Sequence, residues 1–499
     1  MTLLFQKLLC ISGSISVLCT AAAFPAFADD NNTFTDKTLT YEKISGGVRI
    51  VSAEAGTTEI SVSSMIDGFP VLEIGETAFS SCAKLKKVTL PSGLKKIGTG
   101  AFSGCMALES VNIPDTVTEI CDGAFYYCTA VTELSVPKSV TTIGRAAFSN
   151  CLSLEKVTLP DSLTALSERL FYYDISLEEI TLPKDLTTIE QRSFEACYSL
   201  KSVNIPASVT TIEPAAFVGC SGILSYQIAD GNQSYRTDDC GAIYSADGST
   251  MLCYPAGREE KEYTVQAGTV SLAPYACSSS LYLETLNLPE SVTQLGNGLF
   301  SDCQAVKSYV FPSNITAIPE GFFANSTVAS VTIPENITQI GSFAFFGCDL
   351  LTDLTIPQSV TEIGDEAFFG CTALHELFVP ETVQTIGEFA IGYYLPKDAE
   401  NNNQIEQMSD FTLTVKPQTP AKEYAQENDI RFKQIGFDMQ ILLYIGIGAA
   451  AAACITLAVI LILRGKKLKA EQAAAAPPEA PDPNYQSILD QSDEESPLT

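Results

Sequence analysis

A phenylalanine, or a residue that takes its place, recurs along this chain with a period of 23 residues. Thirteen positions follow this pattern, and only the steps from Phe217 to Cys277 and from Phe323 to Phe345 depart from the period. A repeat of this length predicts a solenoid, in which each coil buries its apolar side chains only against the neighbouring coils. The positions are Phe79, Phe102, Phe125, Phe148, Phe171, Phe194, Phe217, Cys277, Phe300, Phe323, Phe345, Phe368 and Ile391.

The pattern inside one period predicts the elements of a coil. In residues 97–114, apolar residues first fall three apart, as in a short helical or 3₁₀ turn, and then alternate with Asn112, as in a strand with one buried face. A proline ends the strand, and a glycine usually follows, where we expect a tight bend at positive φ. The predicted fold is therefore a solenoid of mixed α/β type, mostly β, with stacked parallel strands. The glycines are Gly75, Gly98, Gly144, Gly296, Gly341, Gly364 and Gly387.

This coil consensus, L-x-x-V-x-L/I-P-x-S-V-T-x-I-G-x-x-A-F-x-x-C-x-x-L, resembles the leucine-rich repeats of the BspA-like family of surface proteins over roughly residues 39–435. Residues 231–257 look like the hairpin module that such proteins place between runs of coils. The resemblance implies a leucine-rich repeat solenoid, surface display, and adhesion or ligand binding. It assigns no site to particular residues.

Both ends of the chain carry signals for the cell envelope. Residues 1–28 have the apolar run and the Ala26-Phe27-Ala28 ending of a bacterial secretory signal peptide. Residues 441–463 contain no charge and are long enough for one transmembrane helix. Four basic residues follow at once, so we expect a single-pass membrane protein with the repeats outside and residues 464–499 as a disordered cytosolic tail, a candidate to bind a cytosolic partner.

The remaining chain divides into five predicted parts. These are an N-terminal cap at 29–78, repeats at 79–223, an inserted hairpin module at 224–270, repeats at 271–395, and a C-terminal cap with a juxtamembrane linker at 396–440. Within the caps we expect strands over 39–78 and a strand, helix, strand order after Phe411.

Composition argues against several classes of function. A net charge of −30 disfavours nucleic acid as a partner, because phosphate binding needs a basic surface. The single histidine, His375, occupies a variable strand position and reads as an exposed surface residue, so no histidine-based catalytic set is expected. No nucleotide motif and no C-x-x-C pair occur, and we expect no cofactor, no metal and no catalysis.

Sixteen cysteines raise the question of disulfides. Nine of them recur three places after the core phenylalanine, which favours small buried hydrophobic residues with free thiols, although bridges between neighbouring coils stay open as an alternative. Cys240 and Cys253 flank the Asp247-Gly248 turn, and a disulfide between them is predicted with a pair of free thiols as the alternative.

Two groups of residues are candidates for ligand binding. The module is rich in tyrosine, and tyrosines on a rigid scaffold make good contact surfaces, although cross-strand packing within the hairpin is the simpler explanation. Along the outward strand position, small polar residues give way to apolar ones at two coils. The candidates are Tyr235, Tyr244 and Tyr254 in the module, and Tyr309, Val310 and Phe378 on the strands.

These observations predict a cell-surface protein whose solenoid binds an extracellular protein or glycan, as an adhesin does. One alternative is a single-pass receptor that signals through its tail. Another is an envelope scaffold without catalytic activity.

Overall fold

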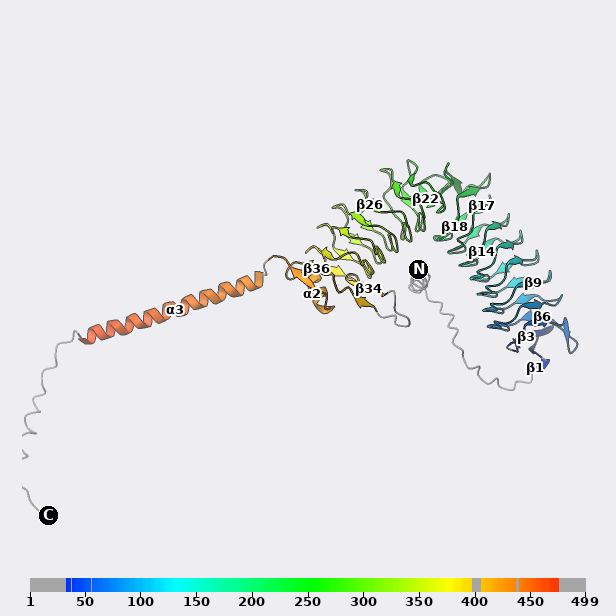
Figure 1. Ribbon diagram of the computed structural model, residues 1–499, viewed down its shortest axis with the longest axis horizontal. Coiled ribbons are helices and arrows are strands. Elements are labelled where there is room, and N and C mark those ends of the chain that lie inside the picture. Colours follow the sequence, from blue (N-terminus) through cyan, green and yellow to red (C-terminus); the bar gives the residue numbers. More distant parts are fainter. Residues whose placement is uncertain (1–32, 37, 55, 397–404, 437–438, 475–499) are drawn as a thin grey trace, which may run out of the picture. The chain divides into compact units, whose positions relative to one another are not determined.

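The computed structural model describes residues 33–36, 38–54, 56–396, 405–436 and 439–474 of the 499-residue chain (Figure 1). The described chain forms two units, a solenoid that reaches Lys433 and a second unit that contains the long helix α3 (Met439–Ala474). The predicted signal peptide, residues 1–28, lies outside the described residues.

Each coil of the solenoid contributes two short strands that pair in parallel with the coils before and after it. β7 (Lys87–Thr89) pairs with β9 (Ser110–Asn112), and β8 (Lys96–Ile97) pairs with β10 (Glu119–Ile120). Lys87 lies opposite Ser110 and Lys96 opposite Glu119, so partners are one 23-residue period apart. The parallel stacking predicted from the repeat is confirmed.

These strands form two rows along the stack. The first row consists of β4 (Glu59–Ser61), β7, β9, β11 (Glu133–Ser135), β13 (Lys156–Thr158), β15 (Glu179–Thr181), β17 (Ser202–Ile205), β19 (Ser225–Ile228), β23 (Glu262–Thr264), β25 (Thr285–Asn287), β26 (Ser308–Val310), β28 (Ser330–Thr332), β30 (Asp353–Leu354) and β32 (Glu376–Phe378). The second row consists of β8, β10, β12 (Thr142–Ile143), β14 (Ala165–Leu166), β16 (Thr188–Ile189), β18 (Thr211–Ile212), β24 (Ser271–Leu272), β27 (Ala317–Ile318), β29 (Gln339–Ile340), β31 (Glu362–Ile363) and β33 (Thr385–Ile386).

The connection around each core phenylalanine is a series of single turns. Around Phe79, the amides of Ala78, Ser80 and Cys82 donate to carbonyls three residues back, which is the 3₁₀ pattern. The amides of Phe79 and Ser81, between them, donate instead to the next coil, at 2.7 Å in both cases. Because turn bonds and stacking bonds alternate, the predicted 3₁₀ character is present without a continuous helix.

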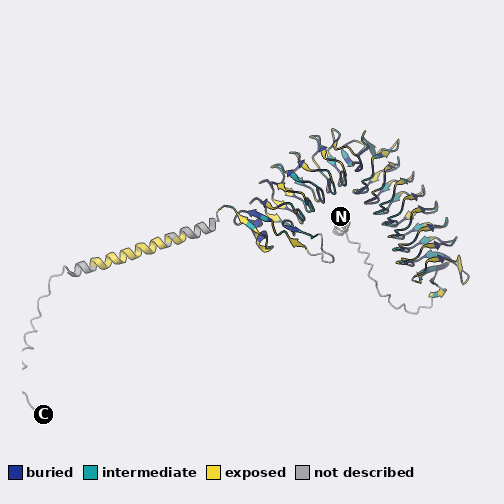
Figure 2. Cartoon of the chain, viewed as in Figure 1, coloured by how far each residue is buried: buried dark blue, intermediate teal, exposed yellow. Residues whose placement is uncertain are grey.

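Like residues lie above like in the core, and buried residues recur from coil to coil along the solenoid (Figure 2). The rings of Phe79 and Phe102 stack with centroids 4.9 Å apart, and those of Phe102 and Phe125 are 5.2 Å apart. The thiol of Cys105 is fully buried and donates to the carbonyl of Phe79 at 3.2 Å, a bond that recurs in later coils. Burial raises the pKa of Cys105 to about 12, so the recurring cysteines act as small buried thiols.

The glycines of the coils serve a different purpose from the predicted one. Gly98 does not have positive φ, but a Cβ there would lie 2.8 Å from the carbonyl oxygen of Ile74 in the preceding coil. Glycine at this position therefore permits close approach of neighbouring coils. Positive φ instead occurs two residues later, as at Gly100, and again at Gly104.

Strands cover the N-terminal end of the stack. β1 (Thr33–Asp36), β2 (Leu39–Ile44) and β3 (Gly47–Ala53) pair antiparallel, and β3 continues in parallel with β6 (Phe69–Ile74). A short β5 (Met65–Ile66) forms a hairpin with β6. Because β6 then pairs with β8, the antiparallel strands join the second row directly.

The interruption after Phe217 is a three-stranded antiparallel sheet. β20 (Tyr235–Thr237) pairs with β21 (Ile243–Ser245), which pairs with β22 (Thr250–Cys253). β22 then pairs in parallel with β24, so the module returns the chain to the second row. The flanking strands β19 and β23 belong to the coils, and the inserted part is therefore shorter than the predicted 224–270. The buried residues form two core clusters that meet within the module, where Ile243 belongs to the first cluster and Tyr244 and Met251 belong to the second.

The C-terminal end follows the predicted order of strand, helix and strand. β36 (Thr412–Val415) pairs with β32, and β37 (Phe432–Gln434) pairs with β36. Between them, α2 (Pro420–Glu427) begins at the N-cap Thr419 and buries Tyr424. A small antiparallel pair, β34 (Tyr393–Tyr394) and β35 (Glu406–Gln407), lies beside this end.

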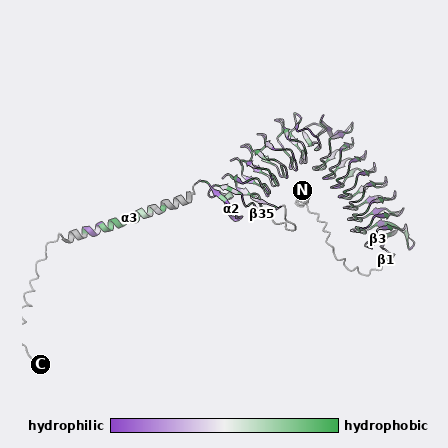
Figure 3. Cartoon of the chain, in the orientation of Figure 1, coloured by the Kyte–Doolittle hydropathy of each residue, from purple (hydrophilic) through white to green (hydrophobic). Residues whose placement is uncertain are grey.

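α3 contains the stretch predicted to cross a membrane. Its described residues between 452 and 463 are exposed and mostly apolar (Figure 3). In the part of the chain that the structure describes, no helix qualifies as a membrane span by length and apolarity. The helix continues to Ala474, so residues 464–474 correct the prediction of a tail disordered from 464, because alanine, lysine, glutamate and glutamine favour helix. Residues 475–499 lie outside the described residues.

Candidate functional site: the turn face

Each coil bends tightly around its core phenylalanine, and three side chains leave the core there. They belong to the residues two before, one after and two after the phenylalanine. The first and third positions have positive φ, for example 59° at Gly100 and 75° at Gly104 around Phe102. Glycine adopts this conformation freely, whereas larger residues are strained in it. We call the surface made by these three positions the turn face.

Large side chains occupy strained positions in several coils, among them Tyr127, Tyr275, Phe343 and Phe389. The two arginines at such positions lie in consecutive coils. Arg169 has φ 57°, Tyr173 has φ 64° and Arg192 has φ 60°. Bulky residues with positive φ are uncommon, and backbone strain of this kind concentrates at functional sites. These coils are therefore the part of the turn face to consider first.

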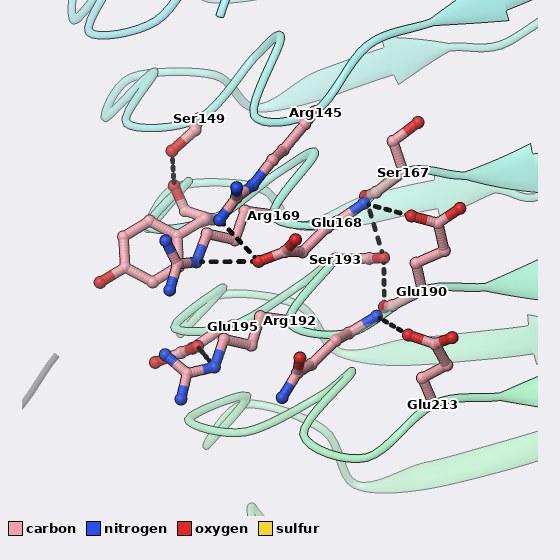
Figure 4. Close-up of polar contacts among 12 residues, drawn as sticks. Arg145, Ser149, Ser167, Glu168, Arg169, Glu190, Arg192, Ser193, Glu195 and Glu213 are labelled. Carbon is pink, nitrogen blue, oxygen red and sulfur yellow. Dashed lines mark hydrogen bonds and ion pairs between the residues drawn. The ribbon is translucent and has the colours of Figure 1, made fainter. Parts of the chain in front are cut away.

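Charged side chains on these coils contact one another along the stack (Figure 4). Arg145 Nη2 lies 2.8 Å from Glu168 Oε1, and Arg169 Nε lies 3.7 Å from the same oxygen. In the next coil Arg192 Nε lies 3.4 Å from Glu195 Oε2, and this pair is largely buried. The geometry leaves the first pair partly open to solvent and encloses the second.

Three tyrosines adjoin these charges. The rings of Tyr172 and Tyr173 are 5.0 Å apart, and the ring of Tyr198 meets that of Tyr173 edge-on at 6.2 Å. The guanidinium of Arg169 lies 5.7 Å from the centroid of Tyr172. Tyr198 is 38% exposed, and the other two rings are half-buried, so this aromatic group can contact a partner.

Two carboxyl groups with raised pKa values belong to the same neighbourhood. Burial raises the pKa of Glu195 to about 7, although Arg192 and Arg169 oppose the shift. Burial also raises the pKa of Asp302 to about 7, and the charge of Glu195 adds to that shift. Asp302 and Glu195 therefore interact electrostatically although the two are distant in sequence, and both also act on Tyr275. We call the following set the turn-face cluster: Arg169, Tyr172, Tyr173, Arg192, Glu195, Tyr198, Tyr275 and Asp302.

The cluster combines aromatic rings with charged donors and acceptors, which suits recognition of another molecule. Glu195 Oε2 and Asp302 Oδ1 are buried without a hydrogen-bond partner. Within the described ranges, no three histidine, cysteine, aspartate or glutamate side chains are grouped so that they could hold a metal ion. His375 is exposed and its Nδ1 lies 3.0 Å from Asp410 Oδ2.

The structure corrects three of the six ligand-binding candidates. Tyr244, Tyr254 and Tyr309 are buried, so they cannot present their rings to an external ligand. The hydroxyl of Tyr244 lies 2.6 Å from that of Tyr263, which in turn donates to Asp238 at 2.6 Å. Because Tyr263 lies on β23, these bonds join the module to the following coil, and the buried rings contribute to packing.

The other three candidates differ in exposure. The hydroxyl of Tyr235 accepts from the amide of Ile212 at 2.9 Å, which ties the half-buried ring to the preceding coil. Val310 is 69% exposed, and Phe378 is half-buried. The six candidates are spread over the module and two separate strands, and they do not form one site.

The predicted disulfide between Cys240 and Cys253 is absent, and both thiols are free. Cys253 lies on β22 opposite Ile243, whereas Cys240 lies in the turn before β21. Cys253 packs against the first core cluster and Cys240 against the second. The two side chains therefore face different parts of the core.

Sequence reasoning missed the charged members of the turn-face cluster. Arg169, Arg192 and Asp302 stand at positions that hold Gly100, Gly123 or Gly104 in other coils. When the coils are aligned position by position, these residues stand out, because other coils have small residues at the same positions. The electrostatic interaction between Asp302 and Glu195 has no signal in the sequence, because it depends on how coils distant along the chain are arranged.

A parallel solenoid with a buried phenylalanine ladder and a recurring leucine defines a leucine-rich repeat protein. The sequence pattern of the BspA type leucine-rich repeat region matches in six copies, over residues 57–174, 118–238 and 270–394. The chain belongs to this family of leucine-rich repeat proteins, as the coil consensus predicts. Proteins of this type are typically found at the cell surface.

Among the similar solved structures, one supports this assignment. A leucine-rich cell surface protein from Faecalibacterium prausnitzii is 31% identical, with a TM-score of 0.55, covering 70% of this chain and 95% of that one. A leucine-rich repeat protein from Bacteroides ovatus is 24% identical, with a TM-score of 0.42, over 81% of this chain and 100% of that one. The pneumococcal vaccine antigen PcpA is 18% identical, with a TM-score of 0.48, over 81% and 99%. No curated protein matches the chain.

Proposed function

We propose that this chain is a cell-surface binding protein, and that its solenoid contacts an external protein or glycan through the turn face of residues 126–198. One observation carries the proposal: bulky side chains stand at strained positions of a rigid backbone while part of each ring stays exposed. Tyr127, with φ 61°, is 40% exposed, and Tyr173, with φ 64°, is half-buried. Catalysis forms no part of the proposal.

The scaffold favours binding because its side chains are held in place before a partner arrives. The amide of Tyr127 donates to the carbonyl of Ser149 at 2.9 Å, and that of Tyr173 to Glu195 at 2.8 Å. Tyrosine offers a large contact area with little conformational entropy to lose on binding. Loops on a rigid scaffold are common binding sites.

We also propose that residues 441–463 anchor the chain in a membrane, after secretion directed by residues 1–28. The stretch has no charge, and its described residues from Ile455 to Leu463 are exposed around the helix, which is typical of a helix that lies in lipid. Membrane fractionation tests the anchor: the full chain should be in the membrane fraction, and a chain with Ile460→Lys and Leu461→Lys should leave it.

Binding is tested with variants that remove a ring and also relieve strain. Tyr127→Gly and Tyr173→Gly place glycine at positions that hold Gly104 and Gly219 in other coils. We expect the full chain to bind immobilised mucin, collagen or intact bacterial cells, and the double variant to bind at least tenfold more weakly while it remains folded. Tyr282→Ala, at an exposed tyrosine outside the proposed face, is the matched control and should bind like the unmodified chain.

A further variant distinguishes binding through the turn face from binding through the outward face of the strands. Val310→Thr matches Thr332 and Thr355 in the neighbouring coils and removes the exposed apolar side chain. If this variant loses binding and the glycine variants keep it, the contact belongs to the strand face. If the folded chain binds none of the probes, the adhesin-like function is wrong.

A further inference from the structure

The guanidinium of Arg169, in the middle of the turn-face cluster, is poorly satisfied. Its Nε is buried and has no hydrogen-bond partner. The group faces Glu168 Oε1 at 3.7 Å and the ring of Tyr172 at 5.7 Å from the centroid, and neither contact is a hydrogen bond. The side chain is 18% exposed, so an acceptor from outside can approach it. Because a guanidinium without acceptors is costly, Arg169 favours a ligand that brings one.

The charges around Arg169 favour a negative ligand. Three arginines from consecutive coils lie along this part of the turn face (Figure 4): Arg145, Arg169 and Arg192. They face two glutamates, since Glu168 is shared by the first two and Glu195 lies 3.4 Å from the third. Burial raises the pKa values of Glu195 and Asp302 to about 7, so neither carries a full negative charge at neutral pH. The arginines therefore outweigh the carboxylates here, in a chain of net charge −30.

Tyrosine rings adjoin the guanidinium. The rings of Tyr172 and Tyr173 are 5.0 Å apart, and the ring of Tyr198, which is 38% exposed, meets Tyr173 edge-on. Such rings offer a flat apolar surface to the C–H face of a sugar ring, and their hydroxyls can bond with its polar edge. An arginine beside tyrosines therefore matches a sugar that carries a carboxylate.

We propose that this part of the turn face binds a sugar with one carboxylate, such as a terminal sialic acid or uronic acid of a glycan. The guanidinium of Arg169 receives the carboxylate, and the rings of Tyr172, Tyr173 and Tyr198 receive the sugar ring. This inference rests on the proposed function and narrows its ligand. A single carboxylate is favoured over a long polyanion, because the net charge of −30 repels a polyanion. An acidic peptide is less suitable, since aspartate and glutamate have no ring to lie on the tyrosines.

Two matched pairs of probes test the carboxylate on the full chain. They are sialyllactose against lactose, and methyl glucuronide against methyl glucoside. In at least one pair the acidic member should bind at least about tenfold more tightly, and that pair identifies the sugar. Equal binding within both pairs would overturn the proposal. Hexa-aspartate is the peptide probe, and if it binds more tightly than both acidic sugars, the ligand is an acidic protein and the sugar is wrong.

Variants test the role of Arg169. Arg169→Gly places at φ 57° the residue found at the same turn position in Gly100, and it should bind the acidic probe no more tightly than the neutral one. Arg169→Lys keeps the charge without the planar fork, so its preference for the acidic probe should be intermediate. Glu366→Gly makes the same change at φ 52° in a distant coil and, as the matched control, should bind like the unmodified chain. An equal loss in Arg169→Gly and Glu366→Gly would contradict the assignment.

Failure of this inference differs from failure of the proposed function. If mucin binds through Tyr127 and Tyr173 but neither pair of probes shows a preference, the turn face binds and the carboxylate is wrong. If the tyrosine variants bind mucin like the unmodified chain and neither pair shows a preference, both are wrong. If Arg169→Gly does not fold, as judged by circular dichroism, the two pairs of probes on the unmodified chain decide alone.

Discussion

The turns around Phe102 and Phe171 share one backbone and carry opposite side chains. Both phenylalanines are fully buried in the same ladder, and both turns place two residues at positive φ. The side chains of the first turn are small and neutral. Those of the second turn are aromatic or charged, and one of them is an acidic side chain buried in the core. The corresponding residues are Gly100, Ser103, Gly104 and Cys105 in the first turn, and Arg169, Tyr172, Tyr173 and Asp174 in the second.

This difference shows that the ladder and the register determine the backbone, while the turn positions vary freely. Glycine adopts φ values of 57° to 75° without strain, yet Arg169 and Tyr173 adopt the same conformation. The backbone keeps it because neighbouring coils bond to it on both sides. Diversity can therefore accumulate on the turn face without a change of fold.

The largest effect should come from the feature that the two turns share. Phe102→Ala and Phe171→Ala each remove a fully buried ring from the stack, and each should lower the free energy of unfolding by about 3–5 kcal/mol. Urea unfolding followed by circular dichroism measures the loss. A loss below about 1 kcal/mol in only one of the two would show that the two turns do not share a scaffold.

The next effect concerns the ladder position that distinguishes the turns. Asp174 is fully buried at a cysteine position, and its Oδ1 accepts from the amide of Cys151 at 2.8 Å. Burial raises its pKa well above 3.8, so the folded state holds a proton that the unfolded state releases, and the carboxyl costs stability as pH rises above 4. Asp174→Cys should therefore stabilise the chain by about 1–3 kcal/mol at pH 7.5 and by little at pH 4.5.

The reciprocal change, Cys105→Asp, is the matched test for this position. It removes the bond from the thiol to the carbonyl of Phe79 and buries a carboxyl in the first turn. It should destabilise the chain by a similar amount, again more at pH 7.5 than at pH 4.5. Urea midpoints at the two pH values decide the matter, and equal shifts at both would contradict the assigned protonation of Asp174.

A smaller effect on stability is expected when tyrosine and glycine replace each other at the position two after the core phenylalanine, where φ is positive. Gly104→Tyr should cost about 1–2 kcal/mol, because φ is 75° while a Cβ would meet only ordinary contacts with Ser81. Tyr173→Gly should change stability by less than about 1 kcal/mol, since relief of strain offsets the lost contact with Tyr198. Thermal unfolding of both variants measures the asymmetry, and an equal loss in both would show that the ring serves packing alone.

The smallest effect concerns the open ion pair of the second turn. Arg145 and Glu168 are each about one-third exposed, and Glu168→Gln should cost about 0.5 kcal/mol or less. The difference should vanish in 1 M salt, where the screening length is about 3 Å. A larger, salt-independent loss would mean that solvent does not screen this ion pair.

The sequence predicted the coils well because a strict period constrains every buried position. The phenylalanine ladder, the parallel strands and the elements after Phe411 are where the pattern placed them. Predictions that depended on three-dimensional contacts were wrong. Gly98 was expected to have positive φ, but glycine is needed there because the carbonyl oxygen of Ile74 lies close to it. Tyr244 and Tyr254 were expected to contact a ligand, but their side chains are buried. The electrostatic interaction between Glu195 and Asp302 could not be predicted, because no local pattern records how distant coils are arranged.

The stacked register also has a consequence for the gene. Because Lys87 lies opposite Ser110 and Lys96 opposite Glu119, a removed or duplicated coil leaves new neighbours with equivalent partners. The coil between Phe323 and Phe345, shorter by one residue, still stacks both rings in the ladder, with centroids 5.6 Å apart. Recombination between repeats can therefore lengthen or shorten this protein by whole coils, and the length of the solenoid can change separately from the side chains on its turns.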